Sequence, residues 1–387
     1  MGDTKVFQPQ YFKNFKCTCG DCSSNCCEHD WQIHIDKNTY DKYMRLGEDE
    51  RQEFSESIRI VSSEPFIAIM LTRNDGGCHF LNEKGFCSIQ LKHGYDYLSR
   101  TCRIHPRSIS YVAGEFETFL ELSCEEAVRV VLFDKSLMKF EESILEPDGS
   151  GNVIPNRMLT AEKYTSAKSG AELFQKLRMA SLRIMQSRQY TVRIRMLILC
   201  MFIQQLDELL TNAGDLEVIR YCNGFLDALE TGVYDTLANE LPDGVDSDVD
   251  FVLDILRDIE AKNDKRFNSN LHKALEGHGI SIASEVPVDF TERYKNSYKH
   301  FFSDREYVFE NFIVNHILME GFPFNFNNDS GSVMKNYADL LAKFNLIEFL
   351  VVGVCSFHNM FDEWSIIDCV SAFSRKYDHS EKGYLTL

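Results

Sequence analysis

Residues 16–31 read KCTCGDCSSNCCEHDW, and five of these sixteen residues are cysteines. Such a density of thiols indicates a disulfide knot, a zinc site or the seat of an iron–sulfur cluster. The adjacent pair Cys26 and Cys27 and the odd total of 13 cysteines argue against a disulfide framework. Nine of the 13 precede residue 125, so we expect metal or redox chemistry in the first part of the chain.

Composition limits the class of protein. The chain has 387 residues, 44% of them apolar, which is enough for two or three folded domains. A formal net charge of −18 disfavours binding to nucleic acid, which needs concentrated Lys and Arg. The first residues lack the parts of a secretory signal, and no apolar run reaches the roughly 18 residues of a membrane span. We therefore expect a cytoplasmic protein without a transmembrane segment.

The pattern of residues predicts a mainly α fold in two domains. Residues 1–146 mix short helices and a few short strands with turns that contain Gly and Cys, and we assign them to a cysteine-rich metal-binding domain. Residues 147–157 are the predicted linker, because they contain the turn-forming sequence PDGSGN. Residues 158–387 are predicted to be all-helical, since apolar side chains recur there at three- and four-residue steps.

Two elements of the first domain are predicted more specifically. A helix over Lys37–Leu46 follows a capping residue, Asp36 or Asn38. The stretch Tyr111–Ser123 mixes apolar residues with glutamates in an imperfect alternation and is the best strand candidate of the chain.

Cys78 and Cys87 directly follow turns in the sequence. Metal-binding knuckles are built in the same way. Asn74–Gly77 precedes Cys78, and Asn82–Gly85 precedes Cys87. A zinc ribbon would need paired Cys-x2-Cys knuckles, and only Cys19-x2-Cys22 supplies one. Single cysteines on separate turns suit an iron–sulfur cluster, whose four thiolates tolerate irregular spacing. Zinc bound with irregular spacing stays an alternative.

One familiar cluster motif is absent. Radical enzymes that cleave S-adenosylmethionine use Cys-x3-Cys-x2-Cys, whereas His29 occupies the third place after Cys22-x3-Cys26.

Longer matches carry a resemblance to a known family. Cys17-x4-Cys22-x3-Cys26-Cys27, followed by Trp31 and Ile35-Asp36-Lys37, resembles the opening signature of the flagellin lysine-N-methylase family, within a wider set of zinc- or iron-chelating cysteine-box proteins. Later matches are Cys78-His79-Phe80-Leu81, Gly85-Phe86-Cys87, Cys102-Arg103-x2-Pro106-Arg107, Leu122-Ser123-Cys124-x-Glu126, and Phe373-Ser374-Arg375 with His379. The resemblance covers nearly the whole chain. Cys19 is an addition to the family pattern, so we leave it out of the ligand set.

The resemblance implies transfer of methyl groups from S-adenosylmethionine to lysine ε-amines of flagellin, in the cytosol, with a cysteine-bound [4Fe–4S] cluster; zinc is the second choice of metal. It implies eight metal-ligand candidates: Cys17, Cys22, Cys26, Cys27, Cys78, Cys87, Cys102 and Cys124. A single cluster needs four thiolates, and the sequence does not select them. Two metals, or one metal and a redox dithiol, also fit eight cysteines.

The implied reaction also predicts residues of a catalytic pocket. Lysine has a pKa of about 10.4 and must lose its proton before it accepts a methyl group. An acidic or aromatic pocket would favour this, and we assign the role to Asp36, Tyr40 and Glu126, with Tyr43 as a further candidate. Arg103 and Arg107 are the candidates to bind the carboxylate of S-adenosylmethionine.

A second class of function stays open at this point. No recognisable S-adenosylmethionine-binding fingerprint is present, so a zinc- or iron-binding redox sensor without transferase activity is the alternative. For the transferase, the acidic stretch from Asp243 to Asp254 is expected to attract the lysines of flagellin.

Overall fold

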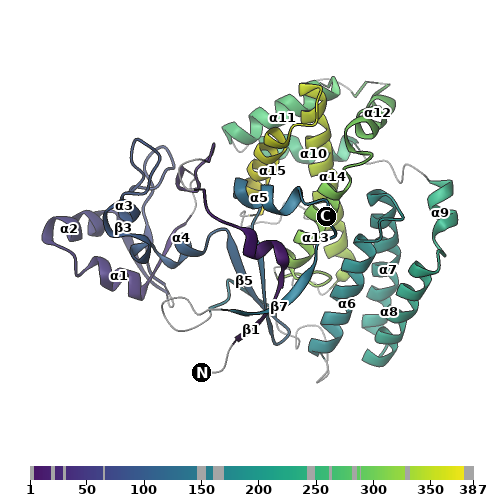
Figure 1. Cartoon of the computed structure of the whole chain (residues 1–387), viewed down its shortest axis with the longest axis horizontal. Helices are drawn as coiled ribbons and strands as arrows, with labels where there is room; N and C mark the ends of the chain where they lie inside the picture. Colours follow the sequence, from purple (N-terminus) through teal and green to yellow (C-terminus); the bar gives the residue numbers. More distant parts are fainter. Residues whose placement is uncertain are drawn as a thin grey trace.

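The computed structural model describes residues 4–18, 22–28, 32–63, 66–145, 154–159, 170–241, 249–260, 264–280, 286–287, 289–326 and 332–378. Its architecture is mainly helical with two small sheets, as predicted. Figure 1 shows two parts side by side. We call residues 22–104 the small lobe. We call the remaining described residues the helical body.

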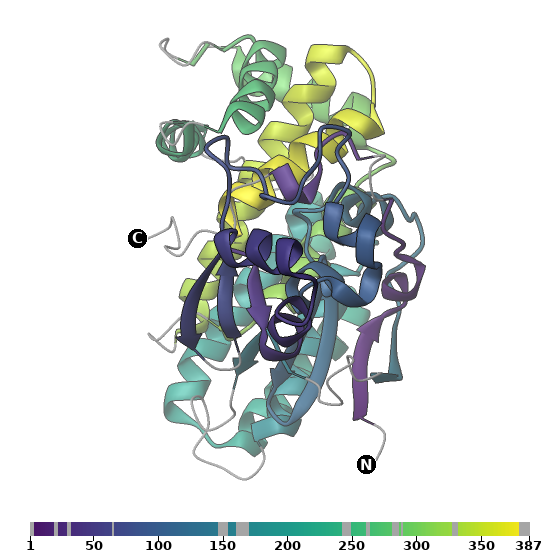
Figure 2. The ribbon, with the colours of Figure 1, turned by 90° about the vertical axis from the view of Figure 1, so that its left-hand side faces the viewer.

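The small lobe is built on a three-stranded antiparallel sheet of order β2-β4-β3, which Figure 2 shows facing the viewer. Its strands are β2 (His34–Asp36), β3 (Ile58–Ser63) and β4 (Phe66–Met70). Its helices are α1 (Lys37–Tyr43), α2 (Glu48–Glu56), α3 (Ser88–His93) and α4 (Arg100–Ile104), with short 3-10 helices η3 (Cys26–Glu28) and η4 (Tyr95–Tyr97). These short elements enclose a small apolar core of their own.

Helix α1 confirms the predicted helix and its cap. The Asp36 carboxylate accepts a hydrogen bond from the Thr39 backbone N–H at 3.0 Å, so Asp36 is the residue that begins the helix. The helix ends at Tyr43 instead of Leu46, because the chain then turns into α2.

A five-stranded sheet of order β7-β1-β6-β5-β8 belongs to the helical body. Its strands are β1 (Thr4–Pro9), β5 (Arg107–Val112), β6 (Glu115–Leu120), β7 (Phe140–Leu145) and β8 (Arg157–Leu159). Strand β1 is parallel to β6 and antiparallel to β7, and β8 is parallel to β5. Apolar residues of this sheet, such as Val112, Phe119 and Leu120, belong to the core of the helices.

The predicted strand Tyr111–Ser123 is wrong in one respect, because it crosses a hairpin turn. Strand β5 ends at Val112, and β6 begins at Glu115. Ala113 and Gly114 form the loop with φ of 48° and 99°. Two-residue hairpin loops favour positive φ because their twist then matches that of the strands. Alanine rarely adopts this conformation, so the turn had no clear signal in the sequence.

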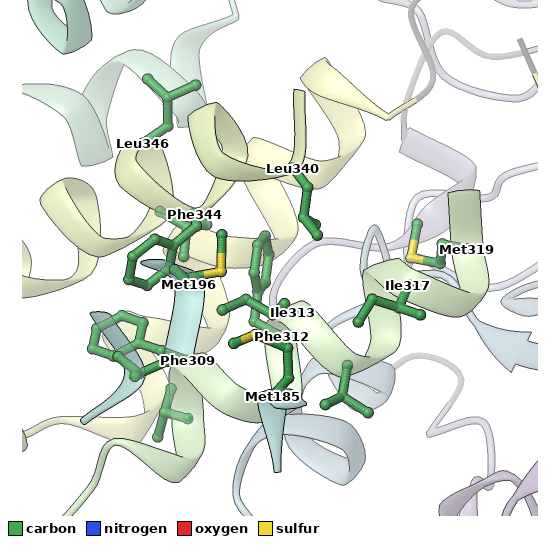
Figure 3. Packing of buried hydrophobic residues seen from close by; sticks show 14 of the residues in the cluster. Met185, Met196, Phe309, Phe312, Ile313, Ile317, Met319, Leu340, Phe344 and Leu346 are labelled. Carbon is green, nitrogen blue, oxygen red and sulfur yellow. The ribbon is translucent and has the colours of Figure 1, made fainter. Parts of the chain in front are cut away.

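The rest of the helical body consists of helices around one large core. They are α5 (Glu125–Leu132), α6 (Gly170–Met185), α7 (Val192–Asn212), α8 (Asp215–Glu230), α9 (Asp235–Glu240), α10 (Val249–Glu260), α11 (Lys265–His278), α12 (Phe290–Phe302), α13 (Tyr307–Glu320), α14 (Val333–His358) and α15 (Glu363–Tyr377), with η1 (Gln10–Asn14). All residues of α13 are buried, and Figure 3 shows its Phe309, Phe312 and Ile313 near Met185 and Met196.

Helix α14 is the one helix of the described residues with the length and composition of a membrane span. However, 72% of its most apolar window is buried inside the molecule. This is the position of a core helix.

Buried ion pairs join the sheet and the helices. Arg178 of α6 pairs with Glu117 of β6, and both side chains are fully buried. The predicted domain limits at residues 146 and 158 stay a prediction, and PDGSGN (residues 147–152) lies outside the described residues. From Gly170 onward, every described element is a helix.

Candidate functional site

All eight predicted metal-ligand cysteines line one cavity of about 190 Å³, which we call the thiol cavity. They come from segments far apart in the sequence, which meet where the small lobe contacts the helical body. Apolar side chains such as Phe15, Ile33 and Leu98 form other parts of its wall. None of the twelve cysteines in the described residues forms a disulfide. Cys19 lies outside the described residues.

Two tight turns place Cys78 and Cys87, as the sequence predicts. In the first turn, the Asp75 carboxylate accepts from the Gly77 N–H at 3.0 Å. In the second, the Asn82 side chain accepts from the N–H groups of Lys84 and Phe86 at 2.9 and 3.0 Å. Each cysteine then makes an isolated β-bridge at the exit of its turn.

The segment that carries Cys26 and Cys27 lies against these turns. The Cys78 N–H donates to the Cys27 carbonyl at 2.7 Å. Asn25 accepts from the Cys27 N–H at 3.0 Å and donates to the Gly85 carbonyl at 2.6 Å. The segment 22–28 is therefore anchored to the exit of the first turn by a backbone hydrogen bond and to the second turn by an amide hydrogen bond.

On its other side, segment 22–28 is bound to the helical body, and we call these contacts the seam. The Glu125 carboxylate, at the start of α5, accepts from the Ser23 hydroxyl at 2.7 Å and from the Ser23 N–H at 3.0 Å. Arg266 of α11 forms ion pairs with Glu125 and with Asp368 of α15. The seam is thus a charged network that crosses between the two parts of the molecule.

A second arginine reaches the seam from the last described helix. Arg375 of α15 donates to the Ser24 hydroxyl at 3.0 Å. The pKa of Cys26 is lowered, chiefly by a hydrogen bond with the Cys27 thiol and in part by the charge of Arg375. Arg375 was noted in the sequence only as part of a family motif, and Arg266 and Glu125 were not predicted as site residues. No signal in the sequence alone connects Arg266 with a cysteine more than two hundred residues away.

Burial dominates the electrostatics of the thiols. It raises the pKa of Cys102 and that of Cys124 to about 12 each, and it also raises the pKa of Cys78 and of Cys87. Metal ions bind thiolates, so any metal in this cavity must displace protons from these groups. Metal binding here is therefore expected to weaken as the pH falls.

The predicted cofactor and catalytic residues divide into two sets. Arg103 and Arg107 line the thiol cavity. The Arg107 guanidinium lies 4.7 Å from the centre of the Phe15 ring and donates to the Phe15 carbonyl at 3.0 Å. Tyr43, the further candidate, also lines the cavity, and its hydroxyl donates to the Tyr97 carbonyl at 2.8 Å.

The three assigned catalytic residues are not among the side chains that line the cavity. Asp36 caps α1 and also accepts from the Arg100 N–H at 3.0 Å. Tyr40 packs against the core of the small lobe. Glu126 forms an ion pair with Arg129, one turn further along α5. A catalytic role for these three residues stays a prediction, while the neighbouring Glu125 occupies the cavity wall.

The side chains do not form a compact site for a single metal ion. Among the residues that the structure describes, no three His, Cys, Asp or Glu side chains lie in such an arrangement. The eight thiols instead lie around the thiol cavity.

Comparison with protein families identifies the chain. A family model described as the FliB lysine N-methylase C-terminal domain matches residues 178–385, more than half of the chain. The chain belongs to the FliB lysine N-methylase family. The match covers α7 to α15 and the second half of α6, and so includes Arg266 and Arg375 of the seam.

Curated relatives of this FliB-family chain agree with the assignment. The flagellar biosynthetic protein FliU of Salmonella muenchen is 28% identical over 154 residues, which are 37% of this chain and 85% of FliU. The lysine-N-methylases of Salmonella choleraesuis and Salmonella typhimurium are each 27% identical over 157 residues. That segment is 38% of this chain and 37% of each lysine-N-methylase. No solved structure matches the chain.

Proposed function

We propose that this chain is a protein-lysine N-methyltransferase that uses S-adenosylmethionine, with flagellin as its substrate, in the cytoplasm. The observation that carries the proposal is the convergence of eight cysteines and two arginines on one cavity, in a chain of a lysine N-methylase family. The names of the flagellar relative and of the lysine-N-methylases support flagellin and its lysines as the substrate.

We further propose that the thiol cavity holds a [4Fe–4S] cluster. A cluster is bound by four thiolates placed around a polynuclear core, while zinc needs its sulfur ligands about 2.3 Å from one ion. Thiols that surround a space of about 190 Å³, without a compact set for one ion among the described residues, suit the cluster better. When bound, it would supply an electron-transfer and Lewis-acid centre at the thiol end of the cavity.

The residues of the cavity support transfer of a methyl group to an amine. The sulfonium–methyl bond of the donor breaks and an N–C bond forms at lysine, whose ε-amine must first release a proton. The apolar wall, including Ile33 and Leu98, favours the neutral amine by desolvation. Glu125 is the carboxylate of the wall and is the candidate to accept the proton.

Arginine side chains are suited to the carboxylate of the donor. Arg107 lines the cavity and donates a hydrogen bond to the Phe15 carbonyl. A guanidinium has five N–H groups, so others can donate to a ligand. Arg103 lines the same wall. A bidentate contact from either arginine would orient the methyl group toward the apolar side of the cavity.

The test is purification without oxygen, followed by a methyl-transfer assay. We expect a brown protein with about four irons and four sulfides per chain, which transfers label from S-adenosylmethionine to lysines of the cognate flagellin. A colourless protein with stoichiometric zinc would refute the cluster. Full iron with no transfer to flagellin would refute the transferase and favour the redox sensor. Arg107→Lys should weaken binding of the donor, and Arg129→Lys, which lies outside the cavity, is the matched control.

A further inference from the structure

The eight thiols of the cavity divide into two groups according to the core against which they pack. Four of them belong to the apolar core of the small lobe or pack against it. One is a buried member of its apolar core, and three are half-buried and pack against that core. We call them the interior cysteines: Cys27, Cys78, Cys87 and Cys102.

The other four thiols lie outside that core. Cys124 packs against the core of the helical body, and the remaining three belong to neither core. Two of the four are exposed and two are half-buried. We call them the seam cysteines: Cys17, Cys22, Cys26 and Cys124.

The backbone of one compact unit fixes the interior cysteines. Cys27 and Cys78 are joined by a backbone hydrogen bond of 2.7 Å, and Cys87 makes a β-bridge with Leu81. Cys102 lies in the first turn of α4, where its N–H donates to the Ser99 hydroxyl at 3.3 Å. The contacts that hold these four positions lie within the small lobe, so the set is preorganised.

The seam cysteines depend on contacts between the two parts of the molecule. Cys22 has a hydroxyl neighbour, Thr18, at 3.0 Å. Its segment is held by Ser23 on Glu125 and by Ser24 on Arg375. Cys124 is the residue that precedes α5. Movement of the small lobe relative to the helical body would therefore change the distances from Cys22 and Cys26 to Cys124.

We propose that the interior cysteines are the four ligands of the cluster and that the seam cysteines are not among them. The proposal rests on the proposed function only in naming the metal group. A cluster needs four thiolates in a rigid, largely water-free setting. The interior cysteines provide this around one core, whereas two of the seam cysteines, Cys17 and Cys26, are exposed.

The first test uses a variant in which all four seam cysteines become serine, purified without oxygen. We expect the iron and sulfide content of the wild type, within about 20%. Loss of most of the iron from a folded variant, judged by its far-ultraviolet circular dichroism, would overturn the assignment. The single variant Cys102→Ala should lose most of the iron, and Cys200→Ala, outside the cavity, is its matched control.

A second measurement does not depend on the folding of a variant. The metal-loaded wild type is treated with iodoacetamide, and the modified cysteines are mapped by mass spectrometry. We expect rapid modification of Cys17 and Cys26 and protection of all four interior cysteines until a chelator removes the metal. Protection of the seam cysteines together with rapid modification of the interior ones would overturn the proposal. If the wild type holds zinc instead of iron, the proposed cluster fails, but the same map still tests the ligand assignment.

Discussion

The small lobe and the helical body are stabilised in different ways. The body contains α14, of 26 residues, and a core in which whole helices are buried. The helices of the small lobe have between five and nine residues, and helices this short are marginal without tertiary support. Thiols form part of the small core itself. The comparison indicates that the body folds on apolar packing, and we propose that the lobe also depends on the metal group proposed for its thiols.

Removal of the metal should therefore have the largest effect, and only on the small lobe. Structural metal sites contribute on the order of 10 kcal/mol to the folding of small domains. After chelation we expect amide hydrogens of β4 and α4 to exchange freely, while those of α13 and α14 stay protected. Hydrogen exchange with mass spectrometry measures both regions in one sample. Equal protection of the lobe with and without metal would contradict the comparison.

A tight helix crossing offers a test confined to the helical body. A Cβ added at Gly277 of α11 would lie 2.0 Å from the carbonyl oxygen of Gly353 in α14. Gly277→Ala should lower the free energy of unfolding by about 3 kcal/mol, with unchanged metal content.

Gly224→Ala is the matched control in α8, because a Cβ there meets nothing within 4 Å. It should raise the stability by about 0.5–1 kcal/mol, since alanine favours helix. Urea unfolding followed by circular dichroism measures both variants. If Gly277→Ala also lost metal, the packing of the helical body would affect the small lobe, which the two separate cores do not predict.

The body should also lose stability in mild acid through His278. Burial lowers the pKa of His278 to about 4, and its Nε2 lies 2.8 Å from the Phe349 carbonyl oxygen. Because the unfolded pKa is about 6.5, the unfolded state binds a proton first as the pH falls. The free energy of unfolding should therefore drop by about 2 kcal/mol between pH 6.5 and pH 4.

Urea unfolding at pH 7 and pH 5 measures this loss, in the wild type and in His278→Gln. Carboxylates titrate in both proteins, so the difference between their pH slopes isolates the histidine. Identical slopes would show that His278 does not contribute to the change of stability with pH.

The smallest expected change in the free energy of unfolding concerns two adjacent glutamates. Glu125→Gln removes the charge that holds Ser23 and Arg266 at the seam, and we expect a loss of about 1.5 kcal/mol. Segment 22–28 should then exchange its amide hydrogens faster. Glu126→Gln breaks only the pair with Arg129, whose side chain is 51% exposed, and should cost less than about 0.5 kcal/mol. If the two substitutions lowered the stability equally, the seam contacts of Glu125 would stabilise the protein no more than the surface ion pair of Glu126.

The sequence brings the candidate metal-ligand cysteines to one cavity but not the candidate catalytic residues, and the reason is physical. A thiol that forms no disulfide has few structural uses, so its residue type alone carries information. A carboxylate has many uses: Asp36, a candidate catalytic residue, also caps α1. Glu125 and Glu126 are adjacent, yet successive helix positions differ by about 100° in direction, and the sequence does not give the rotation of α5. The helices of the body were predictable because their apolar periodicity is long, while the turn at Ala113 left no signal.

The contact between Ser24 and Arg375 has a consequence for the order of assembly. These partners are 351 residues apart. A ribosome therefore synthesises nearly the whole chain before it adds Arg375. The interior cysteines end at Cys102 and emerge long before that moment. Under the proposed function, the small lobe can thus receive its cluster while the helices of the body are still being synthesised, and α15 then closes the seam over a site that is already loaded.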